Sequence, residues 1–553
     1  MNARLAIPLA LVAAAMLLFV PGLGAVHLFD WDEINFAEIS REMLLLDDYS
    51  RVHVDFRPFW EKPPLFFWMQ VGAMELFGVG EFAARLPNAL CGVVTLLVLF
   101  RIGRRLHGTV FGGLWALAYL GSVLPHLYFR SGIIDPWFNL FIFLGIDQFI
   151  QGAWARRDRT GMAGLKHPVA HLTLAGAFLG LAMLTKGQVA FMLFAATAGI
   201  YWLLQRFRMF VSVSQVALLL LVMVAVTGAW FGYETWKNGP WFVTEFVRYQ
   251  YRLFSTPDAG HAGFPGYHFV VLLVGCFPLS LFAIAEMARR KGERTFHEAD
   301  YRRWMLILFW VVLILFTIVK SKIVHYSSMC YFPMSYLAAL YLHRIWQGEA
   351  KAGLALRIGL GVIGGLFVLI TVALPIAGMD IDSIRPLFAQ DPFAMANLDA
   401  DVTWTGWETL AGIWLAGILA FSLCWLAGRD VRWGILTLFS GTALFVTLTL
   451  MFFINKIEGY SQRAAIEFFE ERQGETCYVL TKNYRSYAHL FYTRKPPVTD
   501  RRAWDEEWLF HGDIDRPVYL VCKVTAVEET RAIDGFREIG ARNGFHFFKR
   551  EVP

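Results

Sequence analysis

Acidic and basic residues of this chain stand at the ends of long apolar segments. Asp32 and Glu33 follow the first apolar segment, Glu61 and Lys62 adjoin in W-E-K-P-P, and Asp135 lies within an apolar stretch. Charged groups near a membrane are costly, so these residues are the first candidates for function. Further polar residues of this kind occur along the chain: Lys186, Arg252, His261, Lys320, Lys322 and Tyr326.

This mixture of charges is typical of a site that handles a phosphorylated substrate. Neighbouring Lys and Arg side chains repel one another unless an anion neutralises them, and phosphate is the natural anion at a lipid interface. Carboxylates facing the cations could activate a hydroxyl, hold a divalent cation or grip a sugar. Cleavage of a sugar–phosphate bond needs both groups, because cations stabilise the departing phosphate while the acceptor attacks from the opposite face of the anomeric carbon.

Each of these residues also has a structural interpretation. Asp32 and Glu33 could be solvated loop acids, Asp135 could start a helix ahead of Pro136, and His261, in a Gly- and Pro-rich loop, fits a surface histidine. Anchoring to lipid headgroups is an equal alternative for three lysines, namely Lys186, Lys320 and Lys322.

The composition indicates a membrane protein, so these residues are positioned by helices in a lipid bilayer. Of 553 residues, 57% are hydrophobic and only 17% are charged, against about 25% charged in an ordinary soluble domain. Apolar segments of about 20 residues, each enough to cross the hydrocarbon core, recur along most of the chain. The net charge of +5 comes with Lys and Arg in short loops between these segments, so membrane topology explains it and we expect no nucleic-acid partner.

Thirteen segments have spanning length, and we predict a polytopic α-helical membrane protein. They are residues 5–26, 84–102, 108–128, 133–153, 168–186, 188–205, 210–231, 267–287, 304–319, 324–344, 354–376, 407–427 and 432–454. The shorter segment 63–78 is placed at the membrane interface, because this choice puts the Arg- and Lys-rich loops on one face, as expected for cytoplasmic loops. The N-terminus is then cytoplasmic, and the tail lies outside.

The long outer segments favour an enzyme over a transporter. The segment Ile34 to Asp47 predicts a helix on the membrane surface, with Glu38, Arg41 and Glu42 on one polar face. A coupled transporter is expected to carry ionisable residues near the bilayer midplane, often in related repeats. Here they gather at one interface and no internal repeat is evident, a pattern that fits an enzyme acting on a lipid headgroup.

The tail has the composition of a soluble domain. Residues 455–553 alternate predicted helices and strands, with strands at 477–481, at 518–524 and near the C-terminus, which indicates a small α/β domain. We therefore divide the chain into a membrane domain, 1–454, with interfacial helices in its first outer loop (27–83), and an outer domain, 455–553. A disulfide between Cys477 and Cys522 is possible if this domain faces an oxidising compartment.

Five short motifs stand out: D-E-x-x-F-A-E-I-S-R-E-M (32–43), F-W-E-K-P-P (59–64), I-D-P (134–136), M-L-T-K-G (183–187) and K-S-K-I-V-H-Y (320–326). Together they resemble the motifs of the bacterial lipid A aminoarabinose transferases, within the protein O-mannosyltransferase-like superfamily of GT-C glycosyltransferases. The resemblance implies a GT-C type fold and inverting transfer of a sugar from undecaprenyl phosphate at the periplasmic face of the inner membrane. The chain differs at Asn35-Phe36, where these transferases typically have Arg-Tyr.

The resemblance also implies roles for the candidate residues. Asp32, with Glu33 beside it, would face the acceptor, and Asp135 would complete the catalytic group. The expected donor-phosphate ligands are Lys62, Arg252, Tyr326, Lys186, Lys320 and Lys322. A divalent metal ion is possible, with Glu61 as a candidate ligand and His261 as a weaker one; no other cofactor is expected.

Three functions remain open at this point. The first is transfer of 4-amino-4-deoxy-L-arabinose from undecaprenyl phosphate to lipid A phosphate by a monomer in contact with membrane lipids. The second is transfer of another polyprenyl-phosphate-linked sugar to lipopolysaccharide, another envelope glycan or protein. The third, from another class, is a flippase or transporter for lipid-linked sugars.

Overall fold

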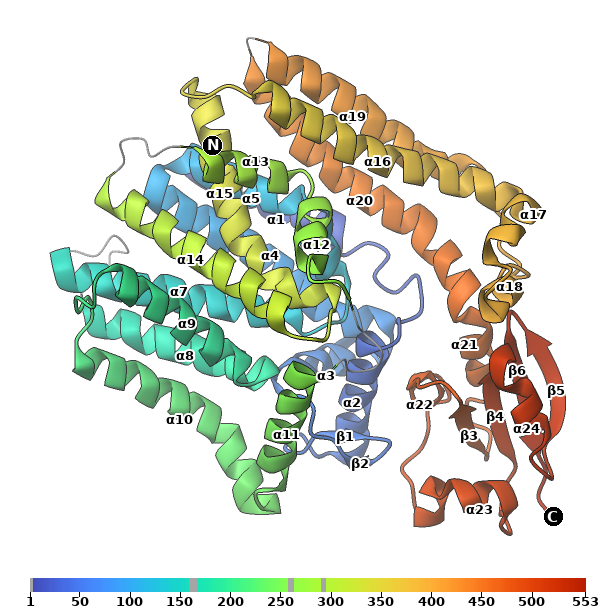
Figure 1. The fold of residues 1–553 in the computed structure, drawn as a ribbon. Coiled ribbons are helices and arrows are strands. Elements are labelled where there is room, and N and C mark those ends of the chain that lie inside the picture. The colour runs from blue at the N-terminus through green and yellow to red at the C-terminus, as the bar shows by residue number, and fades with distance from the viewer. Residues whose placement is uncertain (1–2, 159–166, 257–262, 290–294, 429) are drawn as a thin grey trace.

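The computed structural model describes residues 3–158, 167–256, 263–289, 295–428 and 430–553. Long helices form most of the molecule, and a small domain built around a β-sheet lies at one end of this helical body (Figure 1). The sheet domain contacts the segment that follows the first helix, so the two ends of the chain meet in space.

The long helices form the membrane part. They are α1 (Ala3–Phe19), α4 (Glu81–His107), α5 (Thr109–Leu120), α7 (Asp135–Asp158), α8 (Pro168–Lys186), α9 (Val189–Leu204), α10 (Val213–Asn238), α14 (Phe296–Ile318), α15 (Tyr331–Gln347), α16 (Leu354–Met379), α19 (Leu410–Ala427) and α20 (Val431–Ser461). In the described residues, seven helices are long and apolar enough to cross a membrane, and two bent pairs raise the number to nine. The polytopic helical class is confirmed.

Shorter elements bend or connect these helices. They are α6 (Val123–Leu127), η1 (Tyr128–Arg130), α12 (Tyr267–Gly275), α13 (Leu279–Ala288), η3 (Val324–Cys330), α17 (Ile381–Ile384), η4 (Arg385–Phe388), α18 (Pro392–Asn397) and η5 (Trp407–Thr409). The chain turns by 80° between α5 and the α6–η1 segment and by 112° between α12 and α13. Each of the thirteen predicted segments coincides with a helix or a bent pair, and the number that cross the membrane stays a prediction.

Helix α7 carries polar residues into the helical body. Asp147 accepts a hydrogen bond from Arg105 at 2.8 Å and one from Tyr301 at 3.3 Å. Gln148 bonds His171 at 2.9 Å. Neighbouring helices thus supply partners for polar groups that would be costly to expose to lipid.

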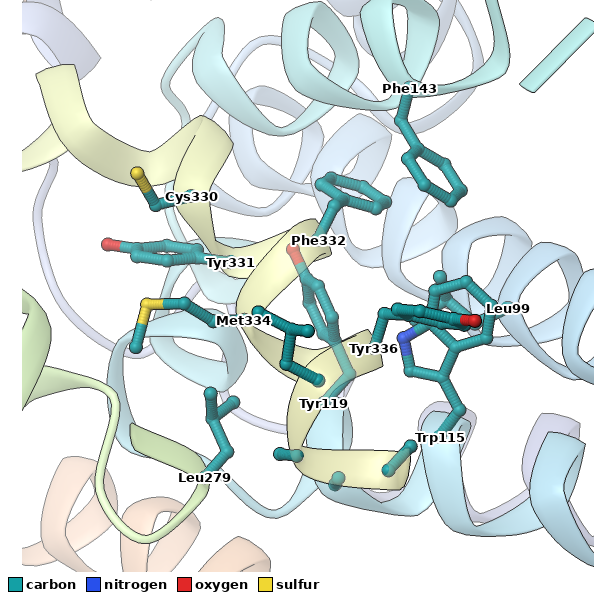
Figure 2. Close-up of a cluster of buried hydrophobic side chains, with 14 of the residues drawn as sticks. Leu99, Trp115, Tyr119, Phe143, Leu279, Cys330, Tyr331, Phe332, Met334 and Tyr336 are labelled. Carbon is teal, nitrogen blue, oxygen red and sulfur yellow. The ribbon is translucent and has the colours of Figure 1, made fainter. Parts of the chain in front are cut away.

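Helix α15 lies at the centre of the helical core (Figure 2). Phe332 stacks on Phe143 with ring centroids 4.6 Å apart, and Tyr336 packs edge-on against Trp115 at 5.1 Å. Trp115 also donates a hydrogen bond to Ser335 at 2.9 Å. Since α15 is buried on nearly all sides, it holds the turn that precedes it, η3, in a fixed position beside α7.

The segment between α1 and α4 contains α2 (Asp32–Leu46), a hairpin of β1 (His53–Val54) and β2 (Arg57–Pro58), and α3 (Leu65–Phe77). A further helix, α11 (Trp241–Ser255), lies near them (Figure 1). The expected polar face of α2 is present, since Arg41 pairs with Glu38 at 2.6 Å. Residues 33–43 are buried in the protein, and the place of this helix at the membrane surface stays a prediction.

The C-terminal domain has one mixed sheet of strand order β3-β4-β6-β5. Its elements are α21 (Arg463–Glu470), β3 (Tyr478–Lys482), α22 (Ala488–Tyr492), η6 (Arg501–Trp504), α23 (Glu506–His511), β4 (Val518–Lys523), η7 (Val524–Ala526), α24 (Val527–Arg531), β5 (Arg537–Arg542) and β6 (Phe545–Arg550). Strand β3 pairs with β4 in parallel, and the other pairs are antiparallel. Strand β5 was not predicted, because its outward-facing sequence lacks an apolar run.

The possible disulfide is absent. Cys477 and Cys522 are both free, because they stand at opposite ends of the β3–β4 ladder. Tyr478, next to Cys477, pairs with Val518, whereas Cys522 pairs with Lys482.

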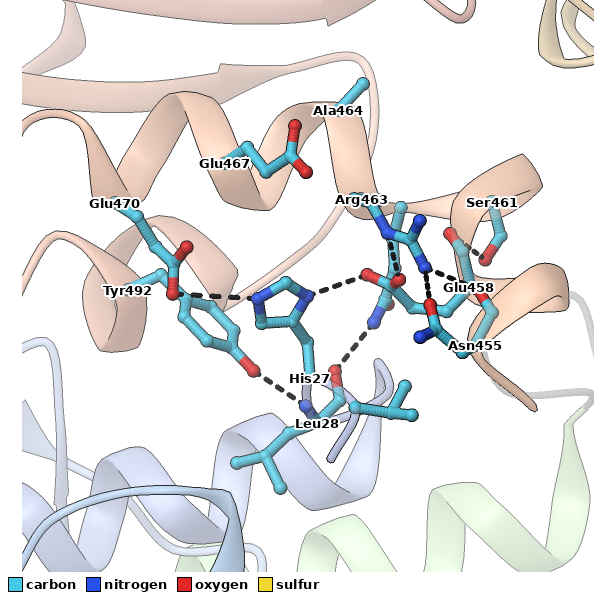
Figure 3. Close-up of polar contacts among 12 residues, drawn as sticks. His27, Leu28, Asn455, Glu458, Ser461, Arg463, Ala464, Glu467, Glu470 and Tyr492 are labelled. Atoms are coloured by element: carbon cyan, nitrogen blue, oxygen red, sulfur yellow. Dashed lines mark hydrogen bonds and ion pairs between the residues drawn. The ribbon is translucent and has the colours of Figure 1, made fainter. Parts of the chain in front are cut away.

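His27 joins the membrane part to the C-terminal domain (Figure 3). Its ring bonds Glu458 at 2.8 Å and lies 3.6 Å from Glu470. The next residue, Leu28, donates its backbone N–H to the Tyr492 hydroxyl at 2.6 Å. These contacts fix the loop that leads directly into α2.

We expect this junction to be more stable at mildly acidic pH. Burial lowers the pKa of His27, but the hydrogen bond and charge of Glu458 and the charge of Glu470 outweigh burial and leave the pKa above its ordinary value. A raised folded-state pKa gives stabilisation that is complete below the ordinary value, about 6.5, and is lost as the pH rises through the folded value. Thermal unfolding in detergent should therefore occur at a higher temperature at pH 6 than at pH 8.

The control is His27→Gln. In this variant, the difference in unfolding temperature between pH 6 and pH 8 should be smaller by the part that His27 contributes. An unchanged difference would contradict the role of His27.

Candidate active site

Glu33 is fully engaged in holding the start of α2. Its carboxylate accepts hydrogen bonds from Arg85 at 3.1 and 2.8 Å and from the backbone N–H groups of Phe29 at 3.0 Å and Gly132 at 2.5 Å. Burial opposes ionisation, but the charge and hydrogen bonds of Arg85 keep the pKa of Glu33 below its ordinary value. This geometry fits an ionised group that positions α2.

Arg85 extends the same network. Its guanidinium also donates to the backbone carbonyls of Leu23, Val26 and His27 at 2.7 to 2.9 Å. One buried cation therefore ties together α4, the loop after α1 and the first turn of α2. Asp32 is the first residue of α2, so the fixed loop before it and the bound Glu33 after it set its position.

Asp32 and Asp135 come together around His325. The His325 Nε2 atom lies 3.7 Å from Asp32 Oδ2 and 4.0 Å from Asp135 Oδ2. Asp135 begins α7 and pairs through Oδ1 with Lys186 Nζ, at the end of α8, at 2.6 Å. The structure thus brings two predicted catalytic carboxylates to one place with a predicted phosphate ligand beside them.

Aromatic rings support the cations on the Lys186 side of this group. Lys186 Nζ lies 5.4 Å from the centre of the Tyr326 ring. Lys62 and Arg252 both lie over Tyr249, at 5.1 and 5.2 Å from its ring centre. The charge of Lys62 also acts on Asp135, His325 and Tyr326, so four of the six predicted donor-phosphate ligands gather on this side.

Two predicted donor-phosphate ligands, Lys320 and Lys322, show no contact with this cluster in the described part of the chain. Lys322 is turned back, and its ammonium donates to the carbonyls of Phe316, Thr317 and Val319 at the end of α14. Lys320 is exposed. Lys322 therefore caps a helix and is not free to bind phosphate.

The described residues contain no site for the possible metal ion. The charge of Glu61 is felt by Tyr487 of the C-terminal domain. Burial, as the larger cause, and the charge of Glu61, as the second, raise the pKa of Tyr487 to about 12. His261 lies outside the described residues. Within the described ranges, no group of three or more His, Cys, Asp and Glu side chains could hold a metal ion, so the possible metal is not supported.

A cavity of about 580 Å³ opens on the other side of Asp32 and His325. Asp30, Arg130 and Ser131 contribute polar groups to its wall. The rest is largely apolar and comes from α20 and from the segments around α1 and α7: Leu23, Val26, Leu127, Ile133, Leu450 and Ile454. Asp32 therefore stands between a cationic side and a partly apolar cavity.

Sequence reasoning missed Arg85 and gave His325 no role in the site. Arg85 begins an apolar segment and was included in a membrane span, although a lone cation in such a segment is a functional signal. His325 stands inside the motif K-S-K-I-V-H-Y, but the spacing in one motif does not reveal that it meets carboxylates from α2 and α7.

The sequence has relatives with named activities. The profile of the family described as dolichyl-phosphate-mannose-protein mannosyltransferase matches residues 61–230. The undecaprenyl phosphate-alpha-4-amino-4-deoxy-L-arabinose arabinosyl transferase of Edwardsiella ictaluri is 27% identical over 65% of this chain and 64% of its own length, which is less than two thirds of that protein. The protein of the same name from Pectobacterium carotovorum is 26% identical over 73% of this chain and 70% of its own length.

The fold also has solved counterparts. ArnT from Cupriavidus metallidurans bound to undecaprenyl phosphate superimposes with a TM-score of 0.75 at 19% identity, covering 98% of this chain and 97% of that one. The apo state of ArnT gives a TM-score of 0.72 at 20% identity over the same shares of the chains. The chain therefore has the GT-C fold of ArnT and is a sequence relative of the bacterial undecaprenyl phosphate-aminoarabinose transferases.

Proposed function

We propose that this chain is an inverting glycosyltransferase that moves a sugar from undecaprenyl phosphate to lipid A phosphate, with 4-amino-4-deoxy-L-arabinose as the first candidate sugar. The observation that carries the proposal is the position of Asp32 between a cationic cluster and a cavity. The names of the sequence relatives and the undecaprenyl phosphate bound to ArnT support this donor and this sugar.

The two sides of the site have separate chemical tasks. The cations Lys62, Lys186 and Arg252 would hold the donor phosphate and stabilise the charge that forms as it leaves. The acceptor oxygen would enter from the cavity side and attack the anomeric carbon opposite the departing phosphate, which inverts the configuration. An ionised phosphate acceptor is already a nucleophile, whereas a protonated acceptor would give its proton to Asp32.

The test uses purified protein in detergent with undecaprenyl phosphate-aminoarabinose and lipid A. Mass spectrometry should detect lipid A carrying one added aminoarabinose, together with released undecaprenyl phosphate. In liposomes, movement of the donor across the bilayer without any glycosylated product would instead support the flippase alternative. If product forms only with a different polyprenyl-linked sugar, the protein is still a glycosyltransferase, but aminoarabinose is not its sugar.

We expect Lys62→Ala to weaken binding of undecaprenyl phosphate by about 10- to 100-fold. Loss of one charge-assisted hydrogen bond to phosphate costs about 1.5–3 kcal/mol, which corresponds to this range. Binding is measured by the quenching of tryptophan fluorescence or by calorimetry in detergent. Lys237→Ala is the matched control, because Lys237 is an outer lysine that pairs with Asp48 at 3.8 Å, and its affinity should stay at the wild-type value.

The proposal includes an orientation. We propose a bacterial inner-membrane protein with a cytoplasmic N-terminus and with the active site and residues 455–553 in the periplasm, as a monomer. Because α20 runs without a break to Ser461, the outer domain would be carried on a continuous helix. A periplasm-active reporter fused after Pro553 should be active and one fused at Arg289 inactive; the opposite pair of results would reverse the orientation.

A further inference from the structure

His325 meets both carboxylates of the site through a single ring nitrogen. Its Nε2 atom lies 3.7 Å from Asp32 and 4.0 Å from Asp135, and the ring also lines the cavity. The two acids come from α2 and α7, and the histidine comes from η3. His325 is therefore the group through which three separate parts of the chain meet.

The backbone around His325 is fixed to the helix that carries Asp135. Ser328 donates its hydroxyl to the His325 carbonyl at 2.6 Å and accepts a hydrogen bond from Asn139 of α7 at 2.7 Å. Asn139 follows Asp135 by one helical turn. The distance between His325 and Asp135 is thus set by local hydrogen bonds rather than by a flexible loop.

Asp135 has an oxygen available for this contact. Lys186 binds its Oδ1 atom, whereas its buried Oδ2 atom has no hydrogen-bond partner among the described residues. Such a buried acceptor is costly to leave unpaired. His325 Nε2 lies 4.0 Å from this oxygen.

Charges of both signs face the His325 ring. The carboxylates of Asp32 and Asp135 lie near its Nε2 atom, and the charges of Lys186 and Lys62 also act on it. With its hydrogen on Nε2, the ring can donate to one of these carboxylates and fix its orientation.

We propose that His325 is a positioning residue for sugar transfer: its Nε2 atom, placed between the carboxylates of Asp32 and Asp135, holds the Asp32 carboxylate toward the reacting centre. This inference rests on the proposed function and adds to it a residue that acts through Asp32.

The experiment compares His325→Ala and His325→Gln with the wild type in the aminoarabinose transfer assay. We expect His325→Ala to lower kcat by about 100-fold, with the KM for the donor within about twofold of the wild type. His325→Gln keeps an N–H donor on a side chain of similar reach, so it should recover part of kcat.

His268→Asn is the control for a disturbed turn. His268 bonds Ser327 of the same turn at 3.1 Å, and no carboxylate of the described residues is among the groups whose charge acts on it, so this variant should keep the wild-type kcat. An active wild type whose kcat is unchanged by His325→Ala would overturn the positioning role alone. A fall in donor affinity and unfolding temperature that matches the fall in kcat would overturn it as well, because it would mark a structural effect. A wild type that transfers no sugar would instead remove the proposed function and this inference with it.

Discussion

Asp32→Asn is expected to lower sugar transfer by about 1,000-fold while the protein still folds and inserts. Among the three predicted catalytic acids, Asp32 is the accessible one: its side chain is 26% exposed, against 8% for Glu33 and 3% for Asp135. Only Asp32 combines this exposure with a place in the cavity wall and a contact with His325. The amide has nearly the same size but has no charge and cannot accept a proton, so both electrostatic stabilisation and base catalysis are lost.

The measurement is kcat in the purified transfer assay, with undecaprenyl phosphate binding measured in parallel. Binding should change little, because the donor-phosphate cations lie on the other side of the site. Asp382→Asn is the matched control, since Asp382 is an outer aspartate whose side chain is 90% exposed and pairs with Arg385 at 2.8 Å; it should retain full activity. Near-wild-type kcat in Asp32→Asn would remove Asp32 from the centre of the site.

The helical elements could be predicted from the sequence because the membrane enforces their length and composition. The α2 segment shows a limit of prediction from sequence. Its polar face was predicted correctly, including the Glu38–Arg41 pair, but its burial within the protein was not predicted. The C-terminal domain covers this helix: Arg41 donates to the Lys495 carbonyl at 2.9 Å, and Lys495 pairs with Asp55. These partners are more than 400 positions apart in the sequence, so no local sequence pattern predicts their contact.

The candidate site shows the same limit at the level of single side chains. Residue type and placement at span ends selected Asp32, Lys62, Asp135 and Lys186, because unpaired charges there need a reason. The same rule selected Lys322, whose long side chain folds back to cap α14, and sequence cannot distinguish these two orientations. Glu33 was grouped with Asp32 because they are adjacent, but successive residues of a helix point in different directions.

Arg85→Met is expected to destabilise the protein by about 3–5 kcal/mol, the usual cost of removing one partner of a buried ion pair. The Glu33 carboxylate would stay buried without its cation, and the loop carbonyls of Leu23, Val26 and His27 would lose their donor. Because this network holds the first turn of α2, turnover should fall together with stability. Thermal and denaturant unfolding in detergent measure the loss.

A double-mutant cycle with Glu33→Gln separates the two possible roles of Glu33. If Glu33 is a positioning residue, Glu33→Gln should also lower stability, and the double variant Glu33→Gln/Arg85→Met should be more stable than the sum of the two single losses predicts, because it buries no uncompensated charge. If Glu33 instead takes part in the reaction, Glu33→Gln would keep the wild-type unfolding temperature and lose turnover. The four hydrogen bonds that already occupy the carboxylate favour the first outcome, since a substrate would have to displace Arg85 or a backbone N–H group to reach it.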